Sequence, residues 1–218
     1  MKRIKRIISL CLALLMVVTI CPQKVEAASY DFHFNNIEIV MDQSNTRYGY
    51  WMLDSDTKAK ITKVTISNKA LASVSIDSNK KEIWFSPKKA GSTTVKVTVK
   101  NGSKKKVHTV KLKIYKYENP MTSLKVGKKQ YKSKFDTKKN YYEKKPKKAS
   151  TVKVNVKAKK GYEINNISYA SKVNGEYKYK TLTNGQSFKL DKNTQYLAIS
   201  FRNKKTGCTY STYINYFY

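Results

Sequence analysis

Residues 92–100 read STTVKVTVK and alternate between polar and apolar side chains over most of their length. An alternation of period two places Val95, Val97 and Val99 on one face of a strand and polar side chains on the other. The same pattern recurs in three later stretches, at residues 107–115, 151–158 and 196–202. All four are rich in Val, Ile, Thr, Tyr and Phe, which suit a pleated, half-buried surface. We therefore expect a strand at each place.

Three Asn-Gly pairs separate such stretches, at 101–102, 174–175 and 184–185. Asn and Gly supply the positive φ that two-residue hairpin turns require. No sustained 3.6-residue apolar period occurs after residue 27. The sequence thus predicts an all-β chain of antiparallel sheets, each with one buried and one solvent-facing side.

The N-terminus has the three parts of a secretory signal peptide. MKRIKR is cationic, residues 7–20 are mostly apolar, and small residues follow at Ala27 and Ala28. We expect cleavage between these two alanines. A membrane anchor is disfavoured because fourteen residues fall short of the roughly 20 needed to span a bilayer. A lipid-modified Cys21 is disfavoured because Val18, Thr19 and Ile20 include no small residue before it. The prediction is a secreted chain, with retention at the cell wall left open.

Cleavage would leave a single cysteine, Cys208, and hence no internal disulfide. We interpret this thiol as a small buried hydrophobe rather than a nucleophile. Some cysteine-free surface β-sandwiches cross-link Lys to Asn beside a buried acid. Both residue types are abundant here, so the sequence leaves such a cross-link open.

The chain divides near Pro120, which cannot continue a central strand. Composition changes there as well: residues 29–118 carry a net charge of +9 and residues 119–218 a net charge of +18. The predicted organisation is a signal peptide (1–27), a first β-sandwich (28–118) and a second, Lys- and Tyr-rich β-sandwich (119–218). Halves of about 90 and 100 residues suit small sandwiches of this kind.

The first half resembles the bacterial Ig-like domain of group 2 over residues 67–99, SNKALASVSIDSNKKEIWFSPKKAGSTTVKVTV. Ala72, Ser73 and Val74 match its small-residue strand. Its "kaGtttv" turn and strand are matched by Lys89, Ala90, Gly91, Thr93, Thr94 and Val95. NKKE replaces the usual glycine before the middle strand, and RYGYW (47–51) departs from the usual early strand. The second half looks like a further Ig-like or cadherin-like sandwich through its strand rhythm and KKGYEI (159–164). The resemblance implies two tandem Ig-like antiparallel β-sandwiches.

Catalytic and metal-binding patterns are sparse. After cleavage only His33 and His108 remain, far apart in sequence, and GxSxG, HExxH and phosphate-cradling glycine loops are absent. Asp54-Ser55-Asp56 lacks the further oxygen ligands and turn glycine of a calcium loop. A spatial pair of carboxylates remains a possible catalytic arrangement. We expect no enzyme activity, no metal and no cofactor.

Basic residues dominate the second half. Residues 125–160 hold fifteen Lys and two acids, interleaved with Tyr131, Phe135, Tyr141 and Tyr142. Such a cluster predicts binding to an anionic cell-wall polymer, an acidic glycan or a lipid surface, with the rings stacking on sugars. The same lysines could instead serve solubility alone. The favoured contacts are Lys138, Lys139, Lys144, Lys145, Lys147, Lys148, Lys157, Lys159 and Lys160.

Two alternatives concern other macromolecules. After cleavage the chain has 38 Lys and two Arg, whereas sequence-specific nucleic-acid recognition relies on Arg, so specific nucleic-acid binding is not expected. A protein–protein adhesin or assembly subunit remains open. It would use an exposed strand edge or the Tyr-rich C-terminal strand with Tyr210, Tyr213, Tyr216 and Tyr218.

Overall fold

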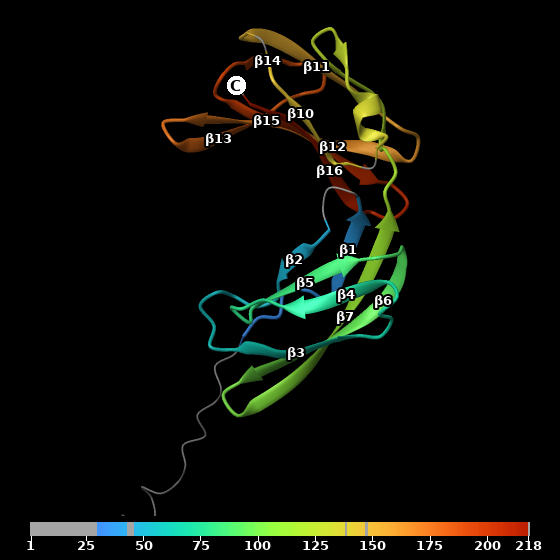
Figure 1. The fold of residues 1–218 in the computed structure, drawn as a ribbon, viewed down its shortest axis with the longest axis vertical. Coiled ribbons are helices and arrows are strands. Elements are labelled where there is room, and N and C mark those ends of the chain that lie inside the picture. The colour runs from blue at the N-terminus through green and yellow to red at the C-terminus, as the bar shows by residue number, and fades with distance from the viewer. Residues whose placement is uncertain (1–29, 43–45, 138, 147, 218) are drawn as a thin grey trace, which may run out of the picture.

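The computed structural model describes residues 30–42, 46–137, 139–146 and 148–217. Strands dominate, and they form two β-sandwiches that lie one above the other along the long axis of the molecule (Figure 1). The all-β fold of two sandwiches predicted from the sequence is confirmed. The predicted signal peptide and its cleavage site, Ala27 and Ala28, lie outside the described residues.

The first sandwich packs a four-stranded sheet, in the order β1-β7-β6-β3, against a three-stranded sheet, β2-β5-β4. Its strands are β1 (Asn36–Met41), β2 (Tyr48–Trp51), β3 (Lys60–Ile66), β4 (Ala72–Ile76), β5 (Glu82–Pro87), β6 (Gly91–Asn101) and β7 (Lys104–Lys116). The strand expected at residues 92–100 is β6, and the one expected at 107–115 lies within β7.

The second sandwich packs a five-stranded sheet, β10-β16-β15-β12-β13, against a four-stranded sheet, β14-β11-β8-β9. Its elements are β8 (Met121–Val126), β9 (Lys129–Gln130), the 3-10 helix η1 (Lys132–Phe135), β10 (Tyr141–Lys144), β11 (Ser150–Ala158), β12 (Tyr162–Val173), β13 (Glu176–Thr181), β14 (Ser187–Leu190), β15 (Thr194–Asn203) and β16 (Thr209–Tyr216). The strands expected at 151–158 and 196–202 are β11 and β15.

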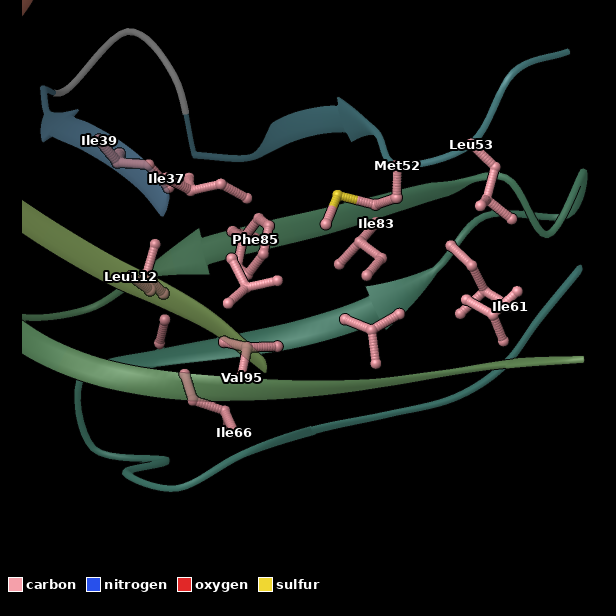
Figure 2. Close-up of a cluster of buried hydrophobic side chains, with 14 of the residues drawn as sticks. Ile37, Ile39, Met52, Leu53, Ile61, Ile66, Ile83, Phe85, Val95 and Leu112 are labelled. Atoms are coloured by element: carbon pink, nitrogen blue, oxygen red, sulfur yellow. The ribbon is translucent and has the colours of Figure 1, made fainter. Parts of the chain in front are cut away.

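Each sandwich encloses its own cluster of buried apolar side chains. In the first, the alternating valines of β6 are at most 1% exposed, and Val95 lies in one cluster with Phe85 and Ile83 of the opposite sheet (Figure 2). In the second, Leu197, Ile199 and Phe201 of β15 are fully buried. Full burial of one such side chain contributes about 1.5–3 kcal/mol. The period-two pattern therefore identified the core-facing positions of the long strands correctly.

Among the described strands, two pairs are parallel rather than antiparallel. β1 runs parallel to β7, and β10 runs parallel to β16. In each pair the first strand comes from a distant part of the chain and needs no tight turn to reach its partner. Period-two patterning carries no information on strand direction, so the sequence could not reveal these pairs.

The Asn-Gly pairs play different roles. Asn174 and Gly175 both have positive φ, 53° and 84°, and form a two-residue turn between β12 and β13. Gly102 begins the tight turn between β6 and β7. The expected third hairpin is absent, because the amide of Asn184 bonds both backbone groups of Val156 at 2.9 Å and ties its loop to the edge of β11. Asn side chains commonly compete for backbone partners in this way.

Two reactive side chains, the thiol of Cys208 and the ammonium of Lys81, belong to buried residues. Cys208 is free and 8% exposed, which confirms its interpretation as a buried residue. Burial raises the pKa of its thiol to about 11, so the thiolate is scarce at neutral pH. The ammonium of buried Lys81 donates a hydrogen bond to the backbone carbonyl of Thr57.

Tyr117 lies between the two sandwiches. It follows β7, and its hydroxyl donates a 2.7 Å hydrogen bond to the carbonyl of Phe135. Its ring meets the ring of Tyr210 edge-on, with centroids 5.2 Å apart. Residues 117–120 form no strand. The placement of a domain boundary at 118/119 stays a prediction.

Candidate functional site

The predicted contact lysines that the structure describes do not gather on one surface. Lys138 and Lys147 lie outside the described residues. Lys144 ends β10, and its carbonyl accepts a hydrogen bond from the amide of Phe217 near the C-terminal end of β16. Lys145 and Lys148 are exposed in the following connection, and Lys139 is exposed just before β10.

The other three predicted lysines lie on or after β11, in the opposite sheet. Lys157 is near the end of β11, and Lys159 and Lys160 follow it. Lys159 forms a 3.5 Å ion pair with Glu118 beside the Tyr117 junction. The part of β11 from Ser150 to Lys157 spans about 23 Å. The described lysines of the predicted set therefore lie on two sheets and toward both ends of the second sandwich.

The aromatic residues expected to stack on sugars beside these lysines are mostly structural. Phe135 is fully buried and Tyr131 is 7% exposed. Tyr142 is half-buried against the second core, and the ammonium of Lys134 lies 5.4 Å from its ring centroid. Only Tyr141 turns to the outer face of its sheet, as its register with Tyr213 shows. Rings that fill a core cannot also bind a ligand.

A compact array of lysines lies instead on the outer face of the first four-stranded sheet. Residues opposite one another in the register share a face. By that rule, β3, β6 and β7 contribute seven exposed lysines, which we call the lysine face: Lys60, Lys63, Lys96, Lys100, Lys105, Lys111 and Lys113. Serine and threonine side chains occupy most of the positions between them.

Three of these lysines stand in a single row across three strands. Lys60 pairs in register with Lys100, and Lys100 pairs with Lys105. Neighbouring strands lie about 4.8 Å apart, so the row spans about 10 Å. It lies beside the β6–β7 turn, at the end of the first sandwich remote from the second (Figure 1).

The row has no acidic residue beside it in its sheet. β1, β3, β6 and β7 contain one acid between them, Glu38. Its carboxylate lies 3.9 Å from the ammonium of Lys113, and it also accepts a 2.9 Å hydrogen bond from the Tyr115 hydroxyl. Like charges placed directly opposite in a sheet are destabilising. The lysine row therefore does not serve the stability of the sandwich.

Replacing Lys100 by glutamate is expected to raise the free energy of unfolding by about 0.5–1 kcal/mol. The change converts two repulsive cross-strand pairs, with Lys60 and Lys105, into two attractive ones. Urea unfolding measures the effect, and Lys100→Gln, which only removes the repulsion, should give a smaller gain. Equal or lower stability in the glutamate variant would show that the row carries no electrostatic cost.

The lysine face escaped the sequence analysis because it depends on register. The alternation in residues 92–100 already placed Lys96 and Lys100 on the polar face of their strand. Given a two-residue turn at Gly102 and Ser103, Lys100 must lie opposite Lys105. Lys60 comes from a strand that is not adjacent in sequence, and no local pattern indicates this neighbour.

The carboxylates beside the junction are engaged with cations. Asp136 accepts hydrogen bonds from the ammonium of Lys132 and the amide of Asn119, both at 2.8 Å. The hydrogen bond from Lys132 is the main cause that lowers the pKa of Asp136. Ionised, ion-paired acids are poor proton donors. Across residues 30–217, as far as they are described, no three His, Cys, Asp or Glu side chains come together to hold a metal ion.

The Tyr-rich C-terminal strand is not an exposed edge. β16 lies between β10 and β15, and Tyr216 is 5% exposed. Tyr210 and Tyr213 are half-buried, and Tyr218 lies outside the described residues. Over residues 213–216, where β10 covers it, this strand offers no free edge to a partner protein, and the adhesin alternative stays a prediction. A strand cannot be recognised as internal until its neighbours are known.

No protein-family model matches the chain, and no curated protein matches it either. Solved structures similar to it include the fibronectin(III)-like modules of CbhA from Clostridium thermocellum, at 10% identity over 87% of this chain and 93% of that one, with a TM-score of 0.33. Another is a SusE-like surface located polysaccharide binding protein from Bacteroides thetaiotaomicron, at 8% identity over 86% and 94% of the chains, with a TM-score of 0.30. Human protocadherin-24 EC1-2 is similar at 8% identity over 88% and 99%, with a TM-score of 0.29.

These likenesses concern the sandwich fold alone, and the group 2 family suggested by residues 67–99 is not confirmed. In the described part of the chain, no helix has the length and apolar character needed to cross a membrane.

Proposed function

We propose that the protein is a secreted, non-catalytic binding module of the cell envelope that holds an anionic polymer on the lysine face. The ligand is a cell-wall polymer or acidic glycan with repeating negative charges. One observation carries the proposal: the row of Lys60, Lys100 and Lys105 has no acid beside it in its sheet, so its positive charge is available to an anionic ligand.

The geometry suits a long, flexible anion better than a small one. The face is an open sheet surface whose ammonium groups end flexible side chains at regular strand spacing. Lysine acts as a mobile point charge and does not impose the bidentate geometry that arginine does. Such a surface supports charge-dependent binding with little dependence on the detailed shape of the anion.

The lysines predicted from the second half extend the same proposal. Lys157, Lys159 and Lys160 are exposed and lie at the end of the second sandwich near the junction. Protein–protein adhesion through an exposed edge such as β13 is the alternative function, and it requires binding that resists salt.

A salt titration tests the proposal. The purified chain is bound to isolated anionic wall polymer and to an acidic glycan between low and physiological salt. Because each lysine that neutralises an anionic group releases about one counterion, the row alone predicts a slope of log affinity against log salt of about −3 or steeper. Binding that is flat in salt would contradict the proposal and favour protein adhesion.

A further inference from the structure

Five tyrosines meet on the outer face of the five-stranded sheet in the second sandwich. Tyr179 and Tyr196 stand on either side of Ala170 in one row, and Tyr141 pairs with Tyr213 in the next. Tyr177, two residues before Tyr179, shares its side of β13. We call this surface the tyrosine face: Tyr141, Tyr177, Tyr179, Tyr196 and Tyr213.

The rings of this face hold one another in place. The rings of Tyr177 and Tyr179 have centroids 6.3 Å apart and planes within 18° of each other. Those of Tyr196 and Tyr213 meet edge-on at 5.8 Å. Ala170 is fully buried although it lies on the outer face, because the small residue is covered by its large neighbours. The result is a surface of preset rings rather than scattered side chains.

The two outermost rings, Tyr177 and Tyr179, stand on an exposed edge strand. Tyr177 is 51% exposed and Tyr179 is 65% exposed. All six residues of β13 are exposed, and the strand is an edge of its sheet that pairs only with β12 (Figure 1). Two adjacent exposed rings on an edge strand form a surface on which a ligand can stack.

The charge beside the rings favours an anionic ligand. The ammonium of Lys172 lies 5.6 Å from the ring centroid of Tyr177. Glu143 on β10 lies at the opposite edge of the sheet from β13. The tyrosine face thus offers flat rings with hydroxyl groups and, at one end, a cation. Acidic sugars are complementary to this surface in three ways. Their apolar ring faces suit the tyrosine rings, their polar edges suit the hydroxyl groups, and their acidic group suits the cation.

We propose that the tyrosine face binds an acidic polysaccharide. Sugar rings stack on Tyr177 and Tyr179, and an anionic substituent meets Lys172. The inference rests on the proposed function, which supplies the anionic polymer as ligand. It deepens that function because it identifies the polymer as a glycan rather than a chain of phosphates alone.

The test compares two polyanions on the full chain. Alginate is a polymer of acidic sugars, whereas polyphosphate carries charge without sugar rings. The variant Tyr177→Ala/Tyr179→Ala is expected to bind alginate about tenfold or more weakly, because two exposed rings are no longer there for the sugars to stack on. Its affinity for polyphosphate is expected to stay at the wild-type value. Tyr177→Phe/Tyr179→Phe keeps the rings and should bind alginate within about twofold of wild type.

Other outcomes separate this inference from its premise. Wild-type alginate binding in the alanine variant, or equal losses for both polymers, would overturn it. Self-association of the wild type that the alanine variant abolishes in sedimentation would overturn it too, and would assign the face to a second copy instead. Failure of the proposed function has a different result: replacing lysines of the lysine face by glutamate would leave polyphosphate binding unchanged. Thermal unfolding of each variant controls for folding.

Discussion

Replacement of Lys60, Lys100 and Lys105 together by glutamate is expected to weaken binding to a linear polyanion by about 100-fold or more at low salt. Three favourable charges become three repulsive ones. Binding also no longer releases the counterions of the anionic groups that these lysines would neutralise. The slope of log affinity against log salt should become shallower by about three, roughly one for each lysine replaced. Binding to immobilised polymer at four or five salt concentrations measures both quantities.

A matched control uses three other exposed lysines of the first half. They are Lys58, Lys69 and Lys89, which lie in connections outside the four strands of the sheet that carries the lysine face. Their reversal to glutamate changes the net charge by the same amount but leaves the row intact. If the two triple variants lose affinity equally, net charge alone governs binding and the lysine face has no special role.

Phe201→Ala is expected to lower the stability of the second sandwich by about 3–5 kcal/mol. Phe201 is fully buried in the second core, and the truncation leaves a cavity beside its cross-strand partners Ile164 and Tyr210. The two core clusters share no residue, so the first sandwich should keep its stability.

Tryptophan fluorescence reports the two halves separately. Both tryptophans, Trp51 and Trp84, belong to the first half. In Phe201→Ala the fluorescence transition should stay at its wild-type denaturant concentration while part of the circular dichroism signal is lost earlier. Phe85→Ala, in the first core, should shift the fluorescence transition itself. If Phe201→Ala moves the fluorescence transition equally, the chain unfolds as one unit and a boundary at 118/119 is contradicted.

The strands and their buried faces could be predicted because they depend on local order in the sequence. Val95, Val97 and Val99 had to share a face once their stretch was a strand, and the structure buries all three. Cys208 was predicted to be buried from its lone, extended context. The parallel pairing of β1 with β7 depends on contacts between distant segments, which no local pattern encodes.

The candidate site was harder to predict because lysines that are frequent in one stretch of sequence need not lie close together in space. Fifteen lysines within residues 125–160 indicated a basic surface, yet the chain there passes from one sheet to the other. Lys60 and Lys100, forty positions apart, lie side by side through the register of β3 and β6. Phe135 and Tyr131 are interleaved with lysines in sequence but fill the core in space.

Lysine acetylation footprinting tests the central claim most directly. The rate of acetylation of each lysine is measured by mass spectrometry with and without saturating anionic polymer. Bound polymer is expected to slow acetylation most at Lys60, Lys96, Lys100 and Lys105, and least at Lys58, Lys69 and Lys89. Uniform slowing over all exposed lysines, or protection that spares the row, would contradict the lysine face as the binding surface.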